Sequence, residues 1–276
     1  MEITLNYLKQ LVFKVYDAIN PLLGQKEASK KFKRGAGGDV TMKIDQIAED
    51  IIISCLEQDK VDCLLISEEI GEIYIGSEKK AKENQNVLII DPLDGSNNAV
   101  RGIPYCSVSI AYAIGTTIND IIFGIILDLN TKSLYWAEKG KGTYLNNKKI
   151  HVSNLDVTQK CFFELNLPMK NLMINLEKLA PIIKKFYRIR VLGSTALSLC
   201  QIASGNMEAF INLRKSNRLV DVAAGILILK EANGRIFSLE GSEIEDSLSI
   251  NVRFPFIACN VQLESFLKEE LVNKNI

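Results

Sequence analysis

The sequence of 276 residues contains a single histidine, His151, which excludes the multi-histidine sites that hold zinc or iron in many enzymes. Its six cysteines form no C-x-x-C pair, a pattern typical of reduced, buried thiols rather than of a disulfide framework. Lys+Arg and Asp+Glu both number 33, so the basic excess of most nucleic-acid-binding proteins is missing. No apolar run approaches the roughly 18 residues that span a bilayer. These absences predict a cytoplasmic protein with no nucleic-acid or membrane partner.

The composition is otherwise that of a globular protein, with 47% hydrophobic and 24% charged residues. The length predicts two domains, which we place at 1–185 and 186–276. Strands are expected at 64–67, 87–90, 107–114, 121–127, 133–137, 148–152, 161–165, 187–192, 209–213 and 256–259. Helices are expected at 3–23, 43–57, 171–185, 195–203, 219–232 and at the C-terminal end. This pattern indicates an α+β N-terminal half with a largely antiparallel sheet, followed by a smaller α/β half.

The segment 91–96, which reads D-P-L-D-G-S, carries the most specific chemistry in the chain. Its proline is expected to end a buried strand at Asp91. The following turn would direct Asp91, the carbonyl of Leu93 and Asp94 toward one point, and such hard oxygen ligands suit Mg²⁺. The glycine allows a close backbone approach, and free N–H groups beside it suit a phosphate if a helix begins here. A capped Asx turn is the alternative interpretation.

Further carboxylates stand at positions where sites often collect ligands. The pair Glu68-Glu69 directly follows a predicted strand, and Asp45 lies near the start of the second helix. Asp221 begins an apolar helix, and Gly193-Ser194-Thr195 precedes another. Each has a structural alternative. The glutamate pair also suits an exposed surface, Asp45 suits a favourable charge at a helix N-terminus, and the other two suit helix caps.

Taken in order, these segments resemble the signatures of the inositol monophosphatase family, D-P-[IL]-D-G-[TS]-x-N and W-D-x-A-[AG]-[GA]. The resemblance covers about residues 38–240. Within the family, the sequence looks most like archaeal members that act on both fructose 1,6-bisphosphate and inositol monophosphate. Two positions depart from the signatures, Ser96 in place of the commoner Thr and Val220 in place of Trp. The resemblance implies a layered α-β-α-β-α sandwich with the active site between its two halves.

The resemblance also implies a magnesium-dependent centre with two or three ions, in which Mn²⁺ can replace Mg²⁺. One ion would be held by Glu68, Asp91 and the Leu93 carbonyl. A second would be held by Asp91, Asp94 and Asp221. Asp94 would also contact the substrate.

Catalytic roles follow from the same resemblance. Asp45 and Ser96 would orient the attacking water, and Glu68 would share a third, weaker ion with them. The N–H groups of Gly95 and Ser96 would bind the phosphate. The glycine-bearing segment 34–38 would be a mobile loop that closes over the site.

Basic residues precede the last apolar helix and bear on the choice of substrate. Arg214, Lys215 and Arg218 suit a second phosphate, because a guanidinium matches phosphate in bidentate fashion. Arg190 and the following Gly193-Ser194-Thr195 are further candidates for substrate contact. A solvated surface charge is the alternative for each basic residue. The balance favours fructose 1,6-bisphosphate.

We therefore expect a phosphoric monoester hydrolase that acts on a small sugar phosphate by in-line attack of a metal-activated water. Its substrates would be fructose 1,6-bisphosphate and inositol 1-phosphate. The alternatives are a 3′-phosphoadenosine 5′-phosphate phosphatase, although no aromatic cluster offers an adenine slot, and an interaction or regulatory protein of the same fold. The family usually forms homodimers, and 106–127 or 171–185 would supply the interface.

Overall fold

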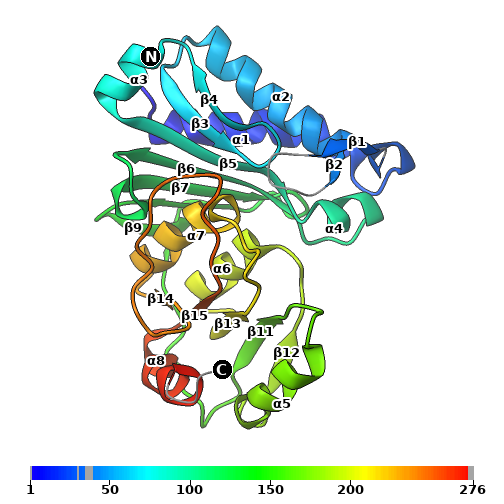
Figure 1. The fold of residues 1–276 in the computed structure, drawn as a ribbon, viewed down its shortest axis with the longest axis vertical. Coiled ribbons are helices and arrows are strands. Elements are labelled where there is room, and N and C mark those ends of the chain that lie inside the picture. Colours follow the sequence, from blue (N-terminus) through cyan, green and yellow to red (C-terminus); the bar gives the residue numbers. More distant parts are fainter. Residues whose placement is uncertain (1, 30, 35–39, 273–276) are drawn as a thin grey trace.

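Two large β-sheets alternate with three layers of helices in the computed structural model, which describes residues 2–29, 31–34 and 40–272 (Figure 1). The outer layers contain α1 (Leu5–Ile19) with α2 (Lys43–Gln58), and α5 (Leu172–Ile183) with α8 (Val261–Leu267). The middle layer contains α6 (Thr195–Ala203) and α7 (Leu219–Glu231). Buried apolar side chains form three clusters within this stack. The arrangement confirms the predicted α-β-α-β-α sandwich.

The larger sheet has eight strands in the order β10-β9-β8-β7-β6-β5-β3-β4. The strands are β3 (Cys63–Ser67), β4 (Gly71–Ile75), β5 (Asn86–Asp94), β6 (Ser107–Ile114), β7 (Ile121–Asp128), β8 (Leu134–Glu138), β9 (Gly142–Leu145) and β10 (Lys148–Ile150). Only the β3–β5 pair is parallel, and every other pair in this sheet is antiparallel. The carboxyl ends of β3 and β5 therefore lie side by side at one edge of the sheet.

The smaller sheet has five strands in the order β12-β11-β13-β15-β14. They are β11 (Phe162–Asn166), β12 (Arg188–Arg190), β13 (Ala209–Asn212), β14 (Arg235–Phe237) and β15 (Phe256–Cys259). Strand β11 is parallel to both of its neighbours, β12 and β13. The shorter elements of the described chain are β1 (Lys31–Arg34), β2 (Val40–Met42), α3 (Glu78–Asn84) and α4 (Ser96–Arg101).

Helix α7 lies between the two sheets, and its residues 222–229 are buried and apolar on all sides, as expected of a helix segment that is covered all round. Its approach to the larger sheet depends on Gly124 in β7. A Cβ atom at Gly124 would lie 2.7 Å from the carbonyl oxygen of Ala224 and 3.3 Å from its Cα atom. On the opposite side, a Cβ atom at Gly225 would lie 2.4 Å from the Leu199 side chain of α6. The layer spacing around α7 is thus set by residues without side chains.

Most predicted helices and strands are present, and the differences have local causes. Strand β5 does not end at Asp91, as predicted, but continues through Pro92 to Asp94. Its pairing with β6 is irregular between Asp91 and Asp94, and a proline is tolerated in such an irregularity because no ladder hydrogen bond is needed there. The second sheet begins with β11, before the predicted division at 185, and the division into two domains stays a prediction.

Two expectations from composition can be compared with the structure directly. All six cysteines are buried and free, which confirms the predicted buried thiols. In the part of the chain that the structure describes, no helix combines the length and the apolar character needed to cross a membrane.

Candidate active site

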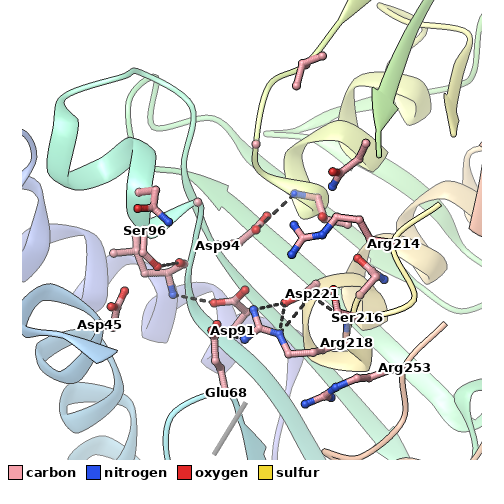
Figure 2. Close-up of a pocket in the computed structure, with 18 of the residues that line it drawn as sticks. Asp45, Glu68, Asp91, Asp94, Ser96, Arg214, Ser216, Arg218, Asp221 and Arg253 are labelled. Carbon is pink, nitrogen blue, oxygen red and sulfur yellow. Dashed lines mark hydrogen bonds and ion pairs between the residues drawn. The ribbon is translucent and has the colours of Figure 1, made fainter. Parts of the chain in front are cut away.

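A pocket of about 630 Å³ lies where the carboxyl end of β5 and the N-terminal ends of α4, α6 and α7 meet (Figure 2). The predicted site residues that line it are Asp45, Glu68, Asp91, Leu93, Asp94, Gly95, Ser96, Gly193, Thr195, Arg214, Arg218 and Asp221. Predicted site residues that are up to 176 positions apart in the chain therefore line the same pocket. The predicted closing segment 34–38 lies, beyond Arg34, outside the described residues.

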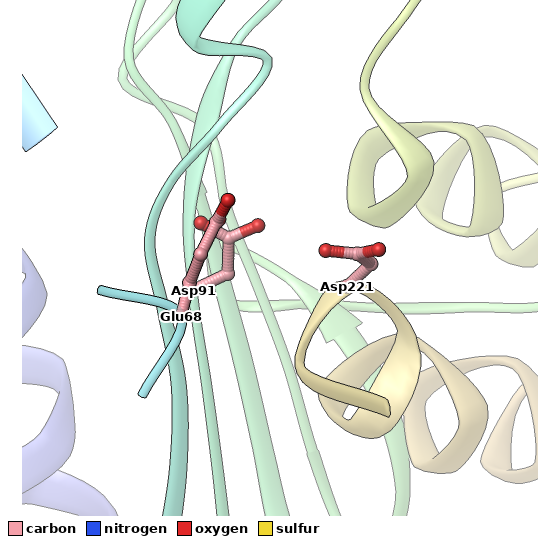
Figure 3. A group of neighbouring side chains, drawn as sticks. All are labelled: Glu68, Asp91 and Asp221. Carbon is pink, nitrogen blue, oxygen red and sulfur yellow. The ribbon is translucent and has the colours of Figure 1, made fainter. Parts of the chain in front are cut away.

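The acidic centre of the pocket is formed by Glu68, Asp91 and Asp221. Each contributes a carboxylate oxygen to a group whose members all lie within 4.8 Å of one another. Glu68 directly follows β3 and Asp91 lies in the neighbouring parallel strand β5, while Asp221 faces them from the first turn of α7 (Figure 3). All three are buried. Buried carboxylate oxygens at this spacing are a donor set that fits a hard divalent cation.

Burial and the repulsion of neighbouring negative charges make the carboxyl groups of Asp91 and Glu68 costly to ionise. Burial raises the pKa of Asp91, and the neighbouring charges of Glu68 and Asp94 raise it further. Burial also raises the pKa of Glu68, and the attraction of Arg218 opposes this without cancelling it. A divalent cation would favour the ionised forms. The electrostatics of the centre therefore agree with its donor set.

A further buried carboxylate, outside the acidic centre, fixes the segment that carries Glu68. Glu49, on α2, accepts a 2.5 Å hydrogen bond from the hydroxyl of Ser67 and a 3.0 Å hydrogen bond from the backbone N–H of Ile70. These two donors flank Glu68 in the chain. Glu49 thus holds the turn after β3 in the orientation that directs Glu68 into the pocket.

Asp94 is attached to the N-terminal end of α6 rather than to the acidic centre. Its carboxylate accepts hydrogen bonds from the Ser194 hydroxyl at 2.6 Å, the Ala196 N–H at 2.7 Å and the Thr195 N–H at 3.3 Å. An anion at a helix N-terminus is favoured by the unpaired N–H groups and the helix dipole. Burial nevertheless raises the pKa of Asp94. Its role as a metal ligand stays a prediction. The three hydrogen bonds leave part of the acceptor capacity of the carboxylate unused, so they do not prevent it from binding a cation.

Asp45 and Ser96 lie on facing elements beside the acidic centre. Asp45, in the first turn of α2, accepts a 2.8 Å hydrogen bond from the Met42 N–H through Oδ2. Its Oδ1 is buried and has no hydrogen-bond partner among the described residues. The Ser96 hydroxyl donates to the Leu93 carbonyl at 2.9 Å. Burial raises the pKa of Asp45. An unpaired buried acceptor next to a carboxylate cluster fits a site built for a cation or a water.

The backbone of the signature segment turns at Gly95, the N-cap residue of α4, with a φ of +88°. A Cβ atom there would lie 2.9 Å from the Tyr105 carbonyl oxygen, so only glycine fits. A short helix that the sequence analysis did not list, α4, begins at Ser96, so the condition stated for phosphate binding by the N–H groups at this turn is met.

The predicted substrate residues differ in how the structure places them. Arg214 lines the pocket, whereas Arg218 points into the acidic centre and pairs with its carboxylates. Ser194 is buried and donates to Asp94, so its hydroxyl is already used. Lys215 and Arg190 are not among the residues that line the pocket. The Arg190 guanidinium lies 4.8 Å from the centroid of the Phe162 ring instead.

Several lining residues were missed by the sequence analysis. Asn166 ends β11, beside the parallel strand β13, and the carboxyl end of a parallel strand is a general signal for site residues. Glu164 lies two residues earlier in the same strand. Arg253 lies between β14 and β15, in a stretch without periodic pattern. Its neighbour across the pocket wall is Arg218, whose backbone forms an isolated antiparallel bridge with that of Arg253. No sequence signal indicates this pairing.

Comparison with known proteins agrees with this geometry. Residues 2–274 match the model of the inositol monophosphatase family. A fructose-1,6-bisphosphatase/inositol-1-monophosphatase of Methanothermobacter thermautotrophicus is 36% identical over 261 residues, which cover 92% of this chain and 91% of the relative. A bifunctional NADP phosphatase/NAD kinase of Methanococcus maripaludis is 32% identical, and the alignment covers 97% of this chain but 48% of that protein.

Solved structures show the same fold. The crystal structure of an inositol monophosphatase–fructose 1,6-bisphosphatase has a TM-score of 0.84 at 28% identity, and the match covers 99% of this chain and 100% of that chain. The extragenic suppressor protein suhB of Bartonella henselae also has a TM-score of 0.84, at 27% identity, with 98% of each chain covered. The family model, the relatives and the solved structures all point to the same family, and the pocket with its buried carboxylates is consistent with it. The chain belongs to the inositol monophosphatase family, a family of metal-dependent phosphatases, and is a hydrolase.

Proposed function

We propose that the protein hydrolyses fructose 1,6-bisphosphate and inositol 1-phosphate in a single site. The observation that carries this proposal is the pairing of opposite charges in one pocket. The acidic centre of Glu68, Asp91 and Asp221 suits a cation that binds the reacting phosphate, and Arg214 and Arg253 line the same pocket. Two phosphates on one small sugar fit such a pair of subsites.

The centre would hold two or three Mg²⁺ ions, for which Mn²⁺ can substitute, through Glu68, Asp91, the Leu93 carbonyl, Asp94 and Asp221. When bound, such ions lower the pKa of a water molecule and stabilise charge on the phosphoryl oxygens. The protein supplies a buried and fixed set of oxygen atoms for them. Glu49 contributes by holding the turn that carries Glu68.

The polar groups beside the centre would position the water and the phosphate. The buried Oδ1 of Asp45 is an acceptor without a partner among the described residues, and it can receive a proton from a water molecule. Ser96 would hold the same water through its hydroxyl. The N–H groups of Gly95 and Ser96, at the start of α4, would bind the phosphate oxygens.

A nucleotide is a less suitable substrate than a sugar phosphate for this pocket. None of the described residues that line it is aromatic, so the stacking surface that an adenine ring favours is missing. NADP⁺ is nevertheless a second candidate substrate, because a relative that is 32% identical is named a bifunctional NADP phosphatase/NAD kinase. Val191, which is 77% exposed and lines the pocket, offers an apolar contact to such a ligand.

Phosphate release in the presence of Mg²⁺ tests the proposed function. We expect fructose 1,6-bisphosphate and inositol 1-phosphate to be turned over faster than NADP⁺ and 3′-phosphoadenosine 5′-phosphate, because the pocket is polar and lacks aromatic groups. EDTA should abolish release from every substrate, and added Mg²⁺ or Mn²⁺ should restore it. The measurement is kcat/KM for the four substrates side by side. Faster turnover of NADP⁺ would replace the proposed substrate class, and release that persists in EDTA would refute the metal centre.

The basic side of the pocket can be tested with Arg214→Ala and Arg253→Ala. Each change should raise KM for fructose 1,6-bisphosphate about tenfold, the cost of one lost charge-assisted contact to phosphate. KM for inositol 1-phosphate, which carries no second phosphate, should change much less. Arg188→Ala, on the exposed edge strand β12, is the matched control and should leave both values unchanged. Equal losses for both substrates would remove these arginines from the recognition of a second phosphate.

The predicted homodimer also remains a proposal. Exposed apolar side chains gather on and near α5 and β12: Met169, Met173, Ile174, Ile189 and Val191. They support an interface that includes 171–185. The other predicted interface, 106–127, is mostly buried within the eight-stranded sheet and offers little free apolar surface.

A further inference from the structure

The side chain of Arg218 occupies the acidic centre. Its guanidinium pairs with the carboxylate of Glu68 through Nη1 and with that of Asp221 through Nη2, at 2.9 Å, and Nε, at 3.1 Å (Figure 2). The Arg218 side chain is only 13% exposed. One guanidinium therefore joins a carboxylate of the large sheet to a carboxylate of α7, next to Asp91.

The backbone of Arg218 is fixed on both sides, so the guanidinium can move only by rotation of its own side chain. Its neighbour Leu219 donates to the Val252 carbonyl at 3.1 Å, and Phe254 donates to the Asn217 carbonyl at 3.0 Å. The Arg218 N–H itself donates to Asp221 at 2.9 Å. These bonds belong to the bridge with the segment around Arg253.

A divalent cation and this guanidinium need the same oxygen atoms. Mg²⁺ binds carboxylate oxygens at about 2.0–2.1 Å with a strict octahedral arrangement. Glu68, Asp91 and Asp221 cannot close around such an ion while Arg218 spans two of them, and two cations in one buried space repel each other strongly. Occupation by one therefore requires displacement of the other.

We propose that Arg218 is a built-in competitor of the divalent cation, which holds the acidic centre together in the metal-free enzyme and must be displaced before an ion is bound. The inference rests on the proposed metal centre. Its consequence is an exchange of one positive charge for another. The metal-free centre never carries its full negative charge, and the affinity for the ion is lower than the carboxylates alone would give.

Direct titration with Mn²⁺ alone, without substrate, tests this inference. Arg218→Met keeps the length of the side chain and removes the charge, and it should bind Mn²⁺ at least about tenfold more tightly, because the displaced hydrogen bonds to charged groups no longer oppose the ion. In EDTA, its unfolding temperature should fall several degrees below that of the unchanged protein. Saturating Mn²⁺ should remove this difference. Calorimetry measures both quantities.

Two further variants separate the possible outcomes. Arg218→Lys keeps the charge but replaces the planar, forked guanidinium by a single ammonium on a shorter side chain, so its Mn²⁺ affinity should lie between the other two. Arg235→Met breaks an ion pair with Glu264 away from the pocket and should leave Mn²⁺ affinity unchanged. Equal or weaker Mn²⁺ binding by Arg218→Met would overturn the inference alone. Absence of Mn²⁺ binding in every protein, including the unchanged one, would overturn the metal centre and the inference with it.

Discussion

Replacement of Asp91 by asparagine is expected to lower kcat/KM for phosphate release by about 10³-fold or more, because it removes a central negative charge of the proposed cation site. Asp91 is 1% exposed, and the negative charges of Glu68 and Asp94 both act on its carboxyl group. Asparagine has nearly the same shape, so its packing in β5 is retained. A carboxamide offers a single oxygen acceptor and no negative charge, so it would be a poorer ligand for the proposed ions.

The same variant should be no less stable than the unchanged protein in EDTA. Burial and neighbouring charges raise the pKa of Asp91, and a carboxyl group whose folded pKa is raised destabilises the fold increasingly as pH rises above its unfolded value. Removal of that charge should therefore raise the unfolding temperature at pH 8 and leave it little changed at pH 4. Asp17→Asn, on the exposed face of α1, is the control and should affect neither activity nor stability. A variant of Asp91 that keeps activity would refute the assigned role.

Substitution of Gly124 by valine is expected to reduce the free energy of unfolding by about 3 kcal/mol, the upper end for overpacking of a core. The new Cβ would lie 2.7 Å from the Ala224 carbonyl oxygen, which is backbone and cannot rotate away. Helix α7 would have to shift from the large sheet. Because α7 carries Asp221, activity should fall together with stability.

Urea unfolding at a fixed, saturating concentration of Mg²⁺ measures this effect. Gly140→Asn is a matched control, because Gly140 has a φ of +77° that asparagine tolerates and nothing within 4 Å of a new Cβ. Its free energy of unfolding should change by less than about 1 kcal/mol. If Gly124→Val proved as mild as this control, the close contact between β7 and α7 would not control the layer spacing.

The acidic centre could be predicted from sequence because its residues stand at structurally marked places. Glu68 follows a short apolar strand, Asp91 directly follows the apolar run 87–90, and Asp221 opens an apolar helix. Parallel pairing of the two strands then brings the first two together. The position of Arg218 was not predictable in this way. Its side chain enters the centre because the backbone is bridged to Arg253, 35 residues later, and no local pattern encodes that bridge.

The elements that the sequence analysis missed are short. Strands β4, β9 and β14 have three to five residues, too few for an alternating pattern to stand out. Helix α3 has seven residues and a charged surface with a single buried side chain, Ala81. The extension of β5 past Pro92 was missed for a different reason. A proline normally ends a strand, and only the irregular pairing with β6 accommodates it here.

Asp94 connects the large sheet to the N-terminal end of α6 by three hydrogen bonds that span about a hundred residues of chain. A side chain held in this way has lost its rotational freedom during folding, before any ligand arrives. The entropy lost by ordering this side chain is therefore part of the free energy of folding, and ligand binding does not lose it a second time. One wall of the pocket is thus preorganised by the same bonds that join two layers of the protein.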